Sequence, residues 1–180
     1  MNNVKITCND EKKMEVVTDY SIEVLKELAA AAGLESIRIT STLRTPEGQA
    51  RAMYHNAKNT GYDKQIALYG PVGRSVLKVS MDKEAELKAA NPNVTDEELK
   101  AAATSAMIEE IGRQFPKRVS RHVVPPEEYA KLNVIDIGYD SVADKEAFRE
   151  ALKAASEKGQ IKYIDEPEND CFHIEIPAKE

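Results

Sequence analysis

The sequence predicts an α+β fold in which a mixed, mostly antiparallel sheet carries helices on one side. Two observations lead to this prediction. Strand-like and helix-like segments alternate along the chain, and the connections between the later segments are short. Short connections favour antiparallel neighbours over the long crossovers that a doubly wound parallel sheet requires.

The individual elements follow from apolar spacing and from capping residues. The expected strands cover 4–8, 36–42, 118–124, 133–138, 161–165 and 169–177. The expected helices cover 20–33, 46–58 and 141–159, with a short helical turn at 125–132. Thr18 or Asp19 is the expected N-cap of the first helix, and Thr45 is that of the second, which has Pro46 in its first position. Gly159 is the expected end of the last helix.

Residues 59–117 differ from the rest of the chain. The stretch 61–80 is irregular, whereas 80–115 is rich in Ala, Glu and Lys and reads as helical, with Thr95 and Glu98 forming a capping box. We expect a single domain spanning 1–180, in which 59–117 is a helical insertion or lid.

Composition and charge narrow the class of partner. The formal net charge of -6 disfavours nucleic acid, which binds basic surfaces, and no apolar run is long enough for a signal peptide or a membrane span. We therefore expect a protein that is cytoplasmic as synthesised and has neither a nucleic-acid nor a membrane partner. The sequence does not determine the oligomeric state, for which a monomer is the expectation. The two cysteines, Cys8 and Cys171, are expected to be reduced thiols.

A small set of polar residues needs an explanation. Asp136 lies inside the apolar strand "VIDI", where a carboxylate requires an ion pair, a hydrogen bond or a metal. With His122 and His173 it forms a set of two histidines and one carboxylate. Three protein ligands and an open fourth position are what a catalytic zinc requires, although a structural ion pair would also account for Asp136.

The final strand, "NDCFHIEIP", has one apolar face and one polar face. Cys171, His173 and Glu175 alternate with apolar residues, so these three share a face. By this spacing Cys171 is an alternative ligand, but the carboxylate is preferred because a thiolate would reduce the Lewis acidity of the metal. The third histidine, His55, is expected to be exposed on a helix.

The stretches "STLRTPEGQ", "SRH", "VIDIG" and "DCFHIEI" occur in the order seen in zinc peptidases of bacterial cell walls. The chain resembles the family of D-alanyl-D-alanine carboxypeptidases, D,D-dipeptidases and phage L-alanyl-D-glutamate endolysins, which shares its metal centre with the Hedgehog signalling domain. The resemblance covers 37–56 and 119–177. It departs from the family in two respects: the interval from His122 to Asp136 is fourteen residues instead of the usual seven, and Phe172 replaces a common Trp.

The resemblance implies a Hedgehog/D,D-peptidase-like fold and a role for each site residue. Zn²⁺ would be held by His122, Asp136 and His173, and Asp170 would be the general base, with Glu168 as the alternative. Residues three apart on a strand face opposite sides, so Asp170 must lie in a bend before the strand. The implied substrate-binding residues are Arg44, as a clamp or oxyanion aid, with Ser41 and Ser120 as supporting hydrogen-bonding groups.

The implied function is that of a zinc metallopeptidase. It would cleave peptidoglycan stem peptides as a D,D-carboxypeptidase or an L-alanyl-D-glutamate endopeptidase, and as a phage endolysin it would act on the cell wall after release. Two alternatives stay open. The long interval from His122 to Asp136 favours a catalytically inactive binding or structural module that keeps the fold, and the third possibility is an α+β protein without a metal.

Overall fold

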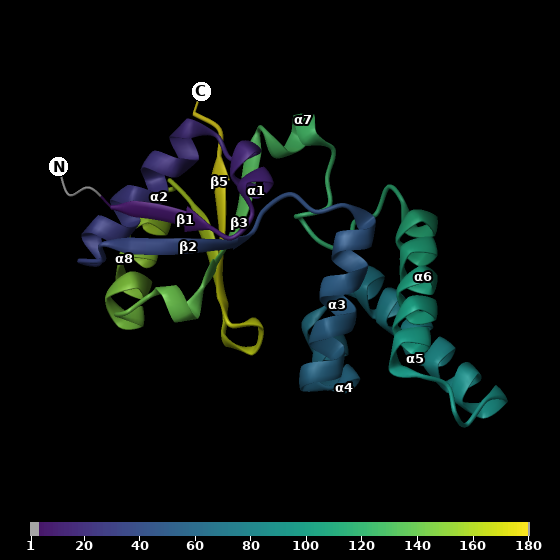
Figure 1. The fold of residues 1–180 in the computed structure, drawn as a ribbon. Coiled ribbons are helices and arrows are strands. Elements are labelled where there is room, and N and C mark those ends of the chain that lie inside the picture. Colours follow the sequence, from purple (N-terminus) through teal and green to yellow (C-terminus); the bar gives the residue numbers. More distant parts are fainter. Residues whose placement is uncertain (1–3, 180) are drawn as a thin grey trace. The chain divides into compact units, whose positions relative to one another are not determined.

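The computed structural model of the protein describes residues 4–179. The chain forms two compact units (Figure 1). A sheet unit combines the chain up to Leu43 with the chain from Val124 onward, and a helical unit comprises Arg44–Val123. The insertion expected at 59–117 falls inside the helical unit, whose bounds are wider on both sides.

The sheet unit is built on one sheet of five strands, counted over the described residues. The strands are β1 (Lys5–Cys8), β2 (Ser36–Ser41), β3 (Leu132–Gly138), β4 (Lys162–Glu166) and β5 (Cys171–Pro177), in the spatial order β1-β2-β3-β5-β4. β1 runs parallel to β2, and the other neighbouring pairs are antiparallel. The predicted α+β class and the mixed, mostly antiparallel sheet are confirmed.

Two long helices, α2 (Asp19–Ala31) and α8 (Lys145–Glu157), pack together beside this sheet (Figure 1). Thr18 is the cap of α2, since its hydroxyl accepts a hydrogen bond from the N–H of Ser21, and Gly159 adopts φ 74° just after α8. The shorter elements of this unit are α1 (Glu11–Glu15), which the sequence did not predict, α7 (Pro126–Tyr129), and the 3₁₀ turns η1 (Tyr139–Ser141) and η2 (Pro167–Asn169).

One face of the central strands is apolar and packs into the same core as α2 and α8. Strand side chains alternate between faces, so the intervening residues of β3 and β5 point to the opposite face. That opposite face carries the polar residues of the candidate site. The core-facing residues of these two strands are Ile135, Ile137, Phe172, Ile174 and Ile176.

The helical unit consists of four helices among the described residues. They are α3 (Pro46–Thr60), α4 (Tyr62–Leu68), α5 (Pro71–Ala90) and α6 (Asp96–Gln114). α6 packs against both α3 and α5, and Thr95 and Glu98 form the predicted capping box at its start. The unit has a core of its own, made by Ala50, Met53, Tyr54, Ala57, Val76, Leu77, Ala103, Met107 and Ile111.

The prediction that 61–80 is irregular is wrong, because this stretch contains α4 and the first half of α5. Pro71 occupies the first turn of α5, where its missing N–H costs nothing. Gly73 serves close packing, since a Cβ there would lie 2.5 Å from Cδ1 of Tyr69. Gly70, Pro71 and Gly73, which are residue types typical of loops, therefore form the N-cap and the first turn of α5.

The strand predicted over 118–124 is also absent, and the chain forms turns there. The N–H of Val123 donates to the carbonyl of Ser120 at 3.1 Å, and the N–H of His122 donates to the Ser120 hydroxyl at 3.3 Å. Local bonds of this kind compete with a strand ladder. In addition, β3 already pairs with β2 on one side and β5 on the other, so it offers this segment no open edge.

None of the helices described within residues 4–179 combines the length and the apolar composition needed to cross a bilayer.

Candidate metal centre

Asp136 and His173 face each other across two neighbouring strands. β3 and β5 pair in a register that sets Asp136 directly opposite His173. Nδ1 of His173 lies 3.0 Å from Oδ1 of Asp136, and the two residues are 9% and 6% exposed. The aspartate inside an apolar strand therefore has a buried imidazole as its partner.

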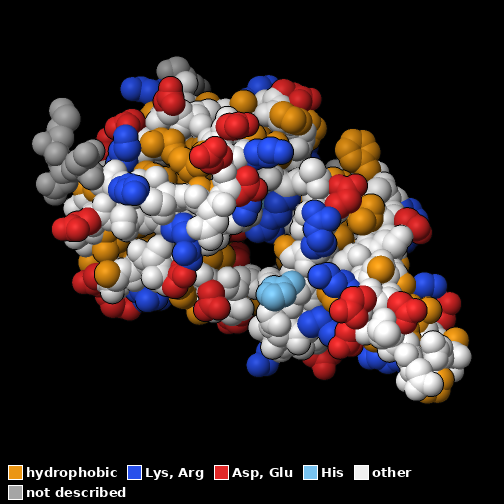
Figure 2. All heavy atoms as spheres, viewed as in Figure 1, with side chains coloured by type: hydrophobic (Ala, Val, Ile, Leu, Met, Phe, Trp, Pro, Cys, Tyr) orange, Lys and Arg blue, Asp and Glu red, His pale blue; other side chains and the backbone are white. Residues whose placement is uncertain are grey.

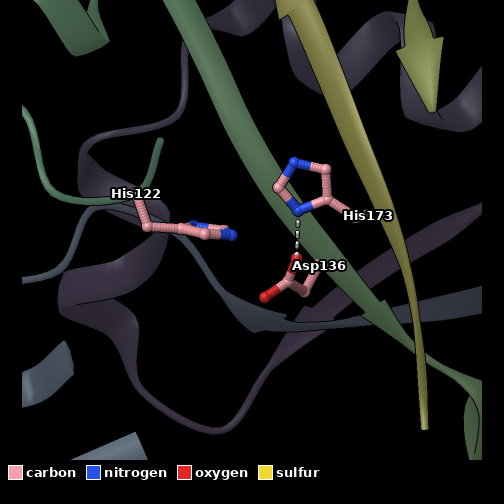
Figure 3. Close-up of side chains that lie close together, drawn as sticks. All are labelled: His122, Asp136 and His173. Atoms are coloured by element: carbon pink, nitrogen blue, oxygen red, sulfur yellow. Dashed lines mark hydrogen bonds and ion pairs between the residues drawn. The ribbon is translucent and has the colours of Figure 1, made fainter. Parts of the chain in front are cut away.

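His122 comes to the same site from a turn. Its carbonyl accepts a hydrogen bond from the N–H of Arg44 at 2.8 Å, and its side chain is 3% exposed. One donor atom from each of His122, Asp136 and His173 lies within 4.8 Å of the other two, and Figure 3 shows the three side chains converging. This group could hold a metal ion.

The donor set suits a catalytic metal. Tetrahedral coordination with bonds of about 2.0–2.2 Å would place donor atoms roughly 3.4 Å apart, so a small closure of the observed group would bind an ion. Two imidazoles and one carboxylate supply three ligands and leave one position open. The residues present therefore fit a metal ion for which imidazole and carboxylate are suitable ligands.

The long interval between His122 and Asp136 is folded onto β3. The Tyr129 hydroxyl, in α7, donates to the carbonyl of Val134 at 2.7 Å. Nδ2 of Asn133 donates to the carbonyl of Tyr129 at 2.8 Å, and both side chains are buried. The extra residues thus form a closed connection, and they do not keep His122 away from Asp136.

A β-bulge brings Ser41 to the site. Ile39 of β2 pairs with Ile137, and Ser41 pairs with Asp136, so Thr40 is an extra residue in β2. In a regular strand Ser41 would share the core-facing side of Ile39; the bulge turns it to the face of Asp136. Ser41 is buried at that position, and its role in substrate binding stays a prediction.

The charges around His173 determine its protonation. Burial alone would lower the pKa of the imidazole, but the hydrogen bond and charge of Asp136, with the charges of Glu166 and Glu175, raise the pKa above its ordinary value of 6.5. A proton and a metal compete for the same nitrogen. Metal uptake should therefore strengthen as the pH rises through the pKa of His173.

Arg44 lies between β2 and α3, as predicted. Thr45 caps α3 by accepting a hydrogen bond from the N–H of Gly48 at 3.1 Å. One guanidinium nitrogen of Arg44 donates to Oε1 of the fully buried Gln49 at 3.1 Å. This contact orients the guanidinium at the start of the helix, and its role as a substrate clamp stays a prediction.

The two predicted bases lie in the bend before β5. Glu168 is in η2, and Asp170 follows at φ 53°, a left-handed conformation that aspartate tolerates better than most residues. The bend that the mechanism requires is thus present, and both residues are exposed. The choice of Asp170 over Glu168 as general base stays a prediction.

The other candidates from the sequence lie outside the group. His55 is exposed on α3, as expected, and its Nε2 lies 2.8 Å from Nδ2 of Asn59. Cys171 is buried on the face of His173, yet it is absent from the metal-binding group found among residues 4–179. Its Sγ lies 3.9 Å from Oε2 of Glu166.

Two acidic residues near His173 were not assigned to the site from the sequence. Oε1 of Glu175 lies 3.5 Å from Nε2 of His173, and Glu175 is 5% exposed. Glu166 of β4 pairs with Cys171 and acts on the charge of His173. The alternation in the last strand already placed Glu175 on the face of His173, whereas Glu166 could be found only from the pairing of β4 with β5.

Comparison of the chain with protein-family models, with curated proteins and with solved structures found no match. The fold and the site therefore define a class of protein: an α+β protein with a buried His–Asp–His group that could hold a metal ion. Any more specific function rests on the residues of the site themselves.

Proposed function

We propose that this protein is a zinc-dependent peptidase that cleaves peptidoglycan stem peptides at bonds involving D-amino acids. The observation that carries the proposal is the convergence of His122, Asp136 and His173 within 4.8 Å. The order of the motifs around these residues supports it. A sheet with helices on one face and ligands on the other is also what a Hedgehog/D,D-peptidase-like fold would require.

The choice of zinc rests on the resemblance. Two imidazoles and a carboxylate suit zinc, but the same donor set also suits ferrous iron in oxygenases. The motifs on which the candidate ligands lie resemble those of zinc peptidases, and this resemblance favours zinc over iron. Elemental analysis of the purified protein would distinguish zinc from iron directly.

Each residue around the centre would have its own role in hydrolysis. When bound, the zinc would acidify a coordinated water and polarise the scissile carbonyl. A carboxylate oxygen of Asp170 would take a proton from that water and pass it to the leaving amine. Arg44 would bind a carboxylate or the carbonyl oxygen of the substrate, since a guanidinium can donate two parallel hydrogen bonds.

Ser120 and Ser41 would support the centre in different ways. The Ser120 hydroxyl accepts a hydrogen bond from the N–H of His122 and so holds the turn that presents this ligand. Ser41 lies opposite Asp136 on the site face of the sheet, where its hydroxyl can contact the carboxylate or the substrate.

The test is digestion of purified peptidoglycan and of defined stem peptides by the zinc-loaded protein, with products identified by mass spectrometry. Loss of a terminal D-alanine would identify a carboxypeptidase, and a new L-alanine carboxyl end would identify the endopeptidase of an endolysin. Chelator-treated protein is the control. A folded, zinc-loaded protein that leaves every stem-peptide bond intact would contradict the proposal and favour the inactive binding module.

A further inference from the structure

Glu175 is a buried acid whose position the proposed reaction does not explain. It lies two residues after His173 on β5, so both side chains are on the site face of the sheet. Only 5% of the residue is exposed. Its neighbours across the two strand pairs are Val134 on β3 and Lys162, an exposed residue, on β4. Burial of a carboxylate is costly and calls for a partner.

The imidazole of His173 is one such partner. Nε2 of His173 lies 3.5 Å from Oε1 of Glu175, while Nδ1 lies 3.0 Å from Oδ1 of Asp136. Figure 3 shows Nδ1, marked by the dashed line, directed at Asp136, and the second ring nitrogen on the far side of the ring. The ring is therefore held between two carboxylates, one inside the metal-binding group and one outside it.

This arrangement decides which nitrogen can bind a metal. A neutral imidazole carries one proton, and only the nitrogen without it can be a ligand. Nδ1 is the nitrogen on the side of Asp136, so when a metal binds to Nδ1 in place of a proton, the remaining proton must reside on Nε2. Histidine ligands commonly donate their second N–H to a carboxylate, which fixes the tautomer and the orientation of the ring.

We propose that Glu175 is a positioning residue that accepts the Nε2–H of His173 and so directs the Nδ1 lone pair at the metal. The inference rests on the metal centre of the proposed function, but it does not depend on which bond the enzyme cleaves. Removal of such an outer carboxylate typically lowers metal affinity by about 10–100-fold.

The first experiment measures zinc affinity by competition with a chromophoric chelator. Glu175→Leu, which has no acceptor, should bind zinc about 10–100-fold more weakly than the wild type. Glu175→Gln keeps an oxygen acceptor and should recover most of the affinity. Glu166→Gln is the matched control: it removes a second negative charge that acts on His173 from the neighbouring strand β4, and it should bind zinc like the wild type.

A second readout keeps the inference testable if the leucine variant does not fold. In the zinc-loaded wild type, a hydrogen bond to a carboxylate should give His173 a protected, downfield Hε2 proton resonance. The near-isosteric Glu175→Gln should move this resonance upfield, because an amide oxygen is a weaker acceptor than a carboxylate.

The outcomes separate this inference from the proposed function. Zinc affinity of folded Glu175→Leu equal to that of the wild type, or an Hε2 resonance unchanged in Glu175→Gln, would overturn the role of Glu175 alone. Equal losses in Glu166→Gln and Glu175→Leu would overturn it too, because general negative charge would then suffice. A wild type that takes up no zinc would overturn the metal centre and this inference with it.

Discussion

At the scale of single residues, His173 has a carboxylate near each of its two ring nitrogens. Its ring lies between the carboxylates of Asp136 and Glu175, and the pairing of β3 with β5 sets its backbone. The same carboxylates that would orient the ring for a metal also favour its protonation in the absence of one. Nδ1 of His173 is thus suited to hold a proton when the site is empty and a metal ion when the site is filled.

The residue-scale prediction concerns the general base. Asp170→Asn should keep zinc and lose about 100-fold or more of the hydrolysis rate, because an amide cannot take the proton of the attacking water. The measurement pairs zinc content with kcat on a defined stem peptide. Glu168→Gln, in the same bend, is the matched control and should keep its activity. The reverse result would make Glu168 the base, and loss of zinc from Asp170→Asn would make Asp170 a ligand.

At the scale of elements, the sequence predicted most of the sheet unit correctly. The alternation in 169–177 identified β5 and its two faces, and Thr18 and Gly159 marked a helix start and a helix end. These signals depend only on residues close together in the sequence, so they can be recognised without knowledge of the fold. The set of His122, Asp136 and His173 was also predicted, because the order of short motifs along the chain indicates it.

Other elements could not be predicted because their cause is not local. Pro71 and Gly73 look like loop residues, and only the packing of Gly73 on Tyr69 explains why they begin a helix. The bulge at Thr40 depends on the register of β2 against β3. The alternation in β5 does place Glu175 on the face of His173, but the contact between the two side chains depends on their conformations, which the alternation does not determine.

The element-scale prediction concerns α5 and α6 of the helical unit. Burial alone would raise the pKa of the Glu110 carboxyl, but hydrogen bonds from Ser75, Gln114 and Arg113 lower it below the ordinary value of 4.5. A carboxyl whose pKa is lower in the folded state stabilises the protein above its unfolded pKa, and this stability is lost as the pH falls through the folded pKa.

Glu110→Gln should therefore lower the free energy of unfolding near neutral pH, and its difference from the wild type should shrink below a pH of about 4.5. Urea unfolding followed by circular dichroism at both pH values measures this. Glu109→Gln, at the exposed neighbouring position, is the matched control for removing a charge. A difference that stays constant with pH would show that the Glu110 charge does not contribute.

At the scale of the whole molecule, the chain divides into two units, each with its own core. Of the three candidate ligands, His122 lies two residues before Val124 in the sequence, and Asp136 and His173 lie on strands β3 and β5. Acidic and basic side chains are interspersed over the face drawn in Figure 2, and on α5 they form pairs such as Lys78–Asp82 at 2.8 Å. The net charge of -6 is thus a small excess of acidic over basic side chains, which are 31 and 25 in number.

The most direct test of the whole account is the metal content of the protein purified without a chelator or an affinity metal. We expect about one zinc per chain in the wild type and in His55→Ala, and little or none in Asp136→Ala and His173→Ala. A stoichiometric amount of iron would support the metal site but contradict the proposal of a zinc peptidase. A folded wild type that contains no metal, and takes up none when zinc is added, would contradict the centre itself.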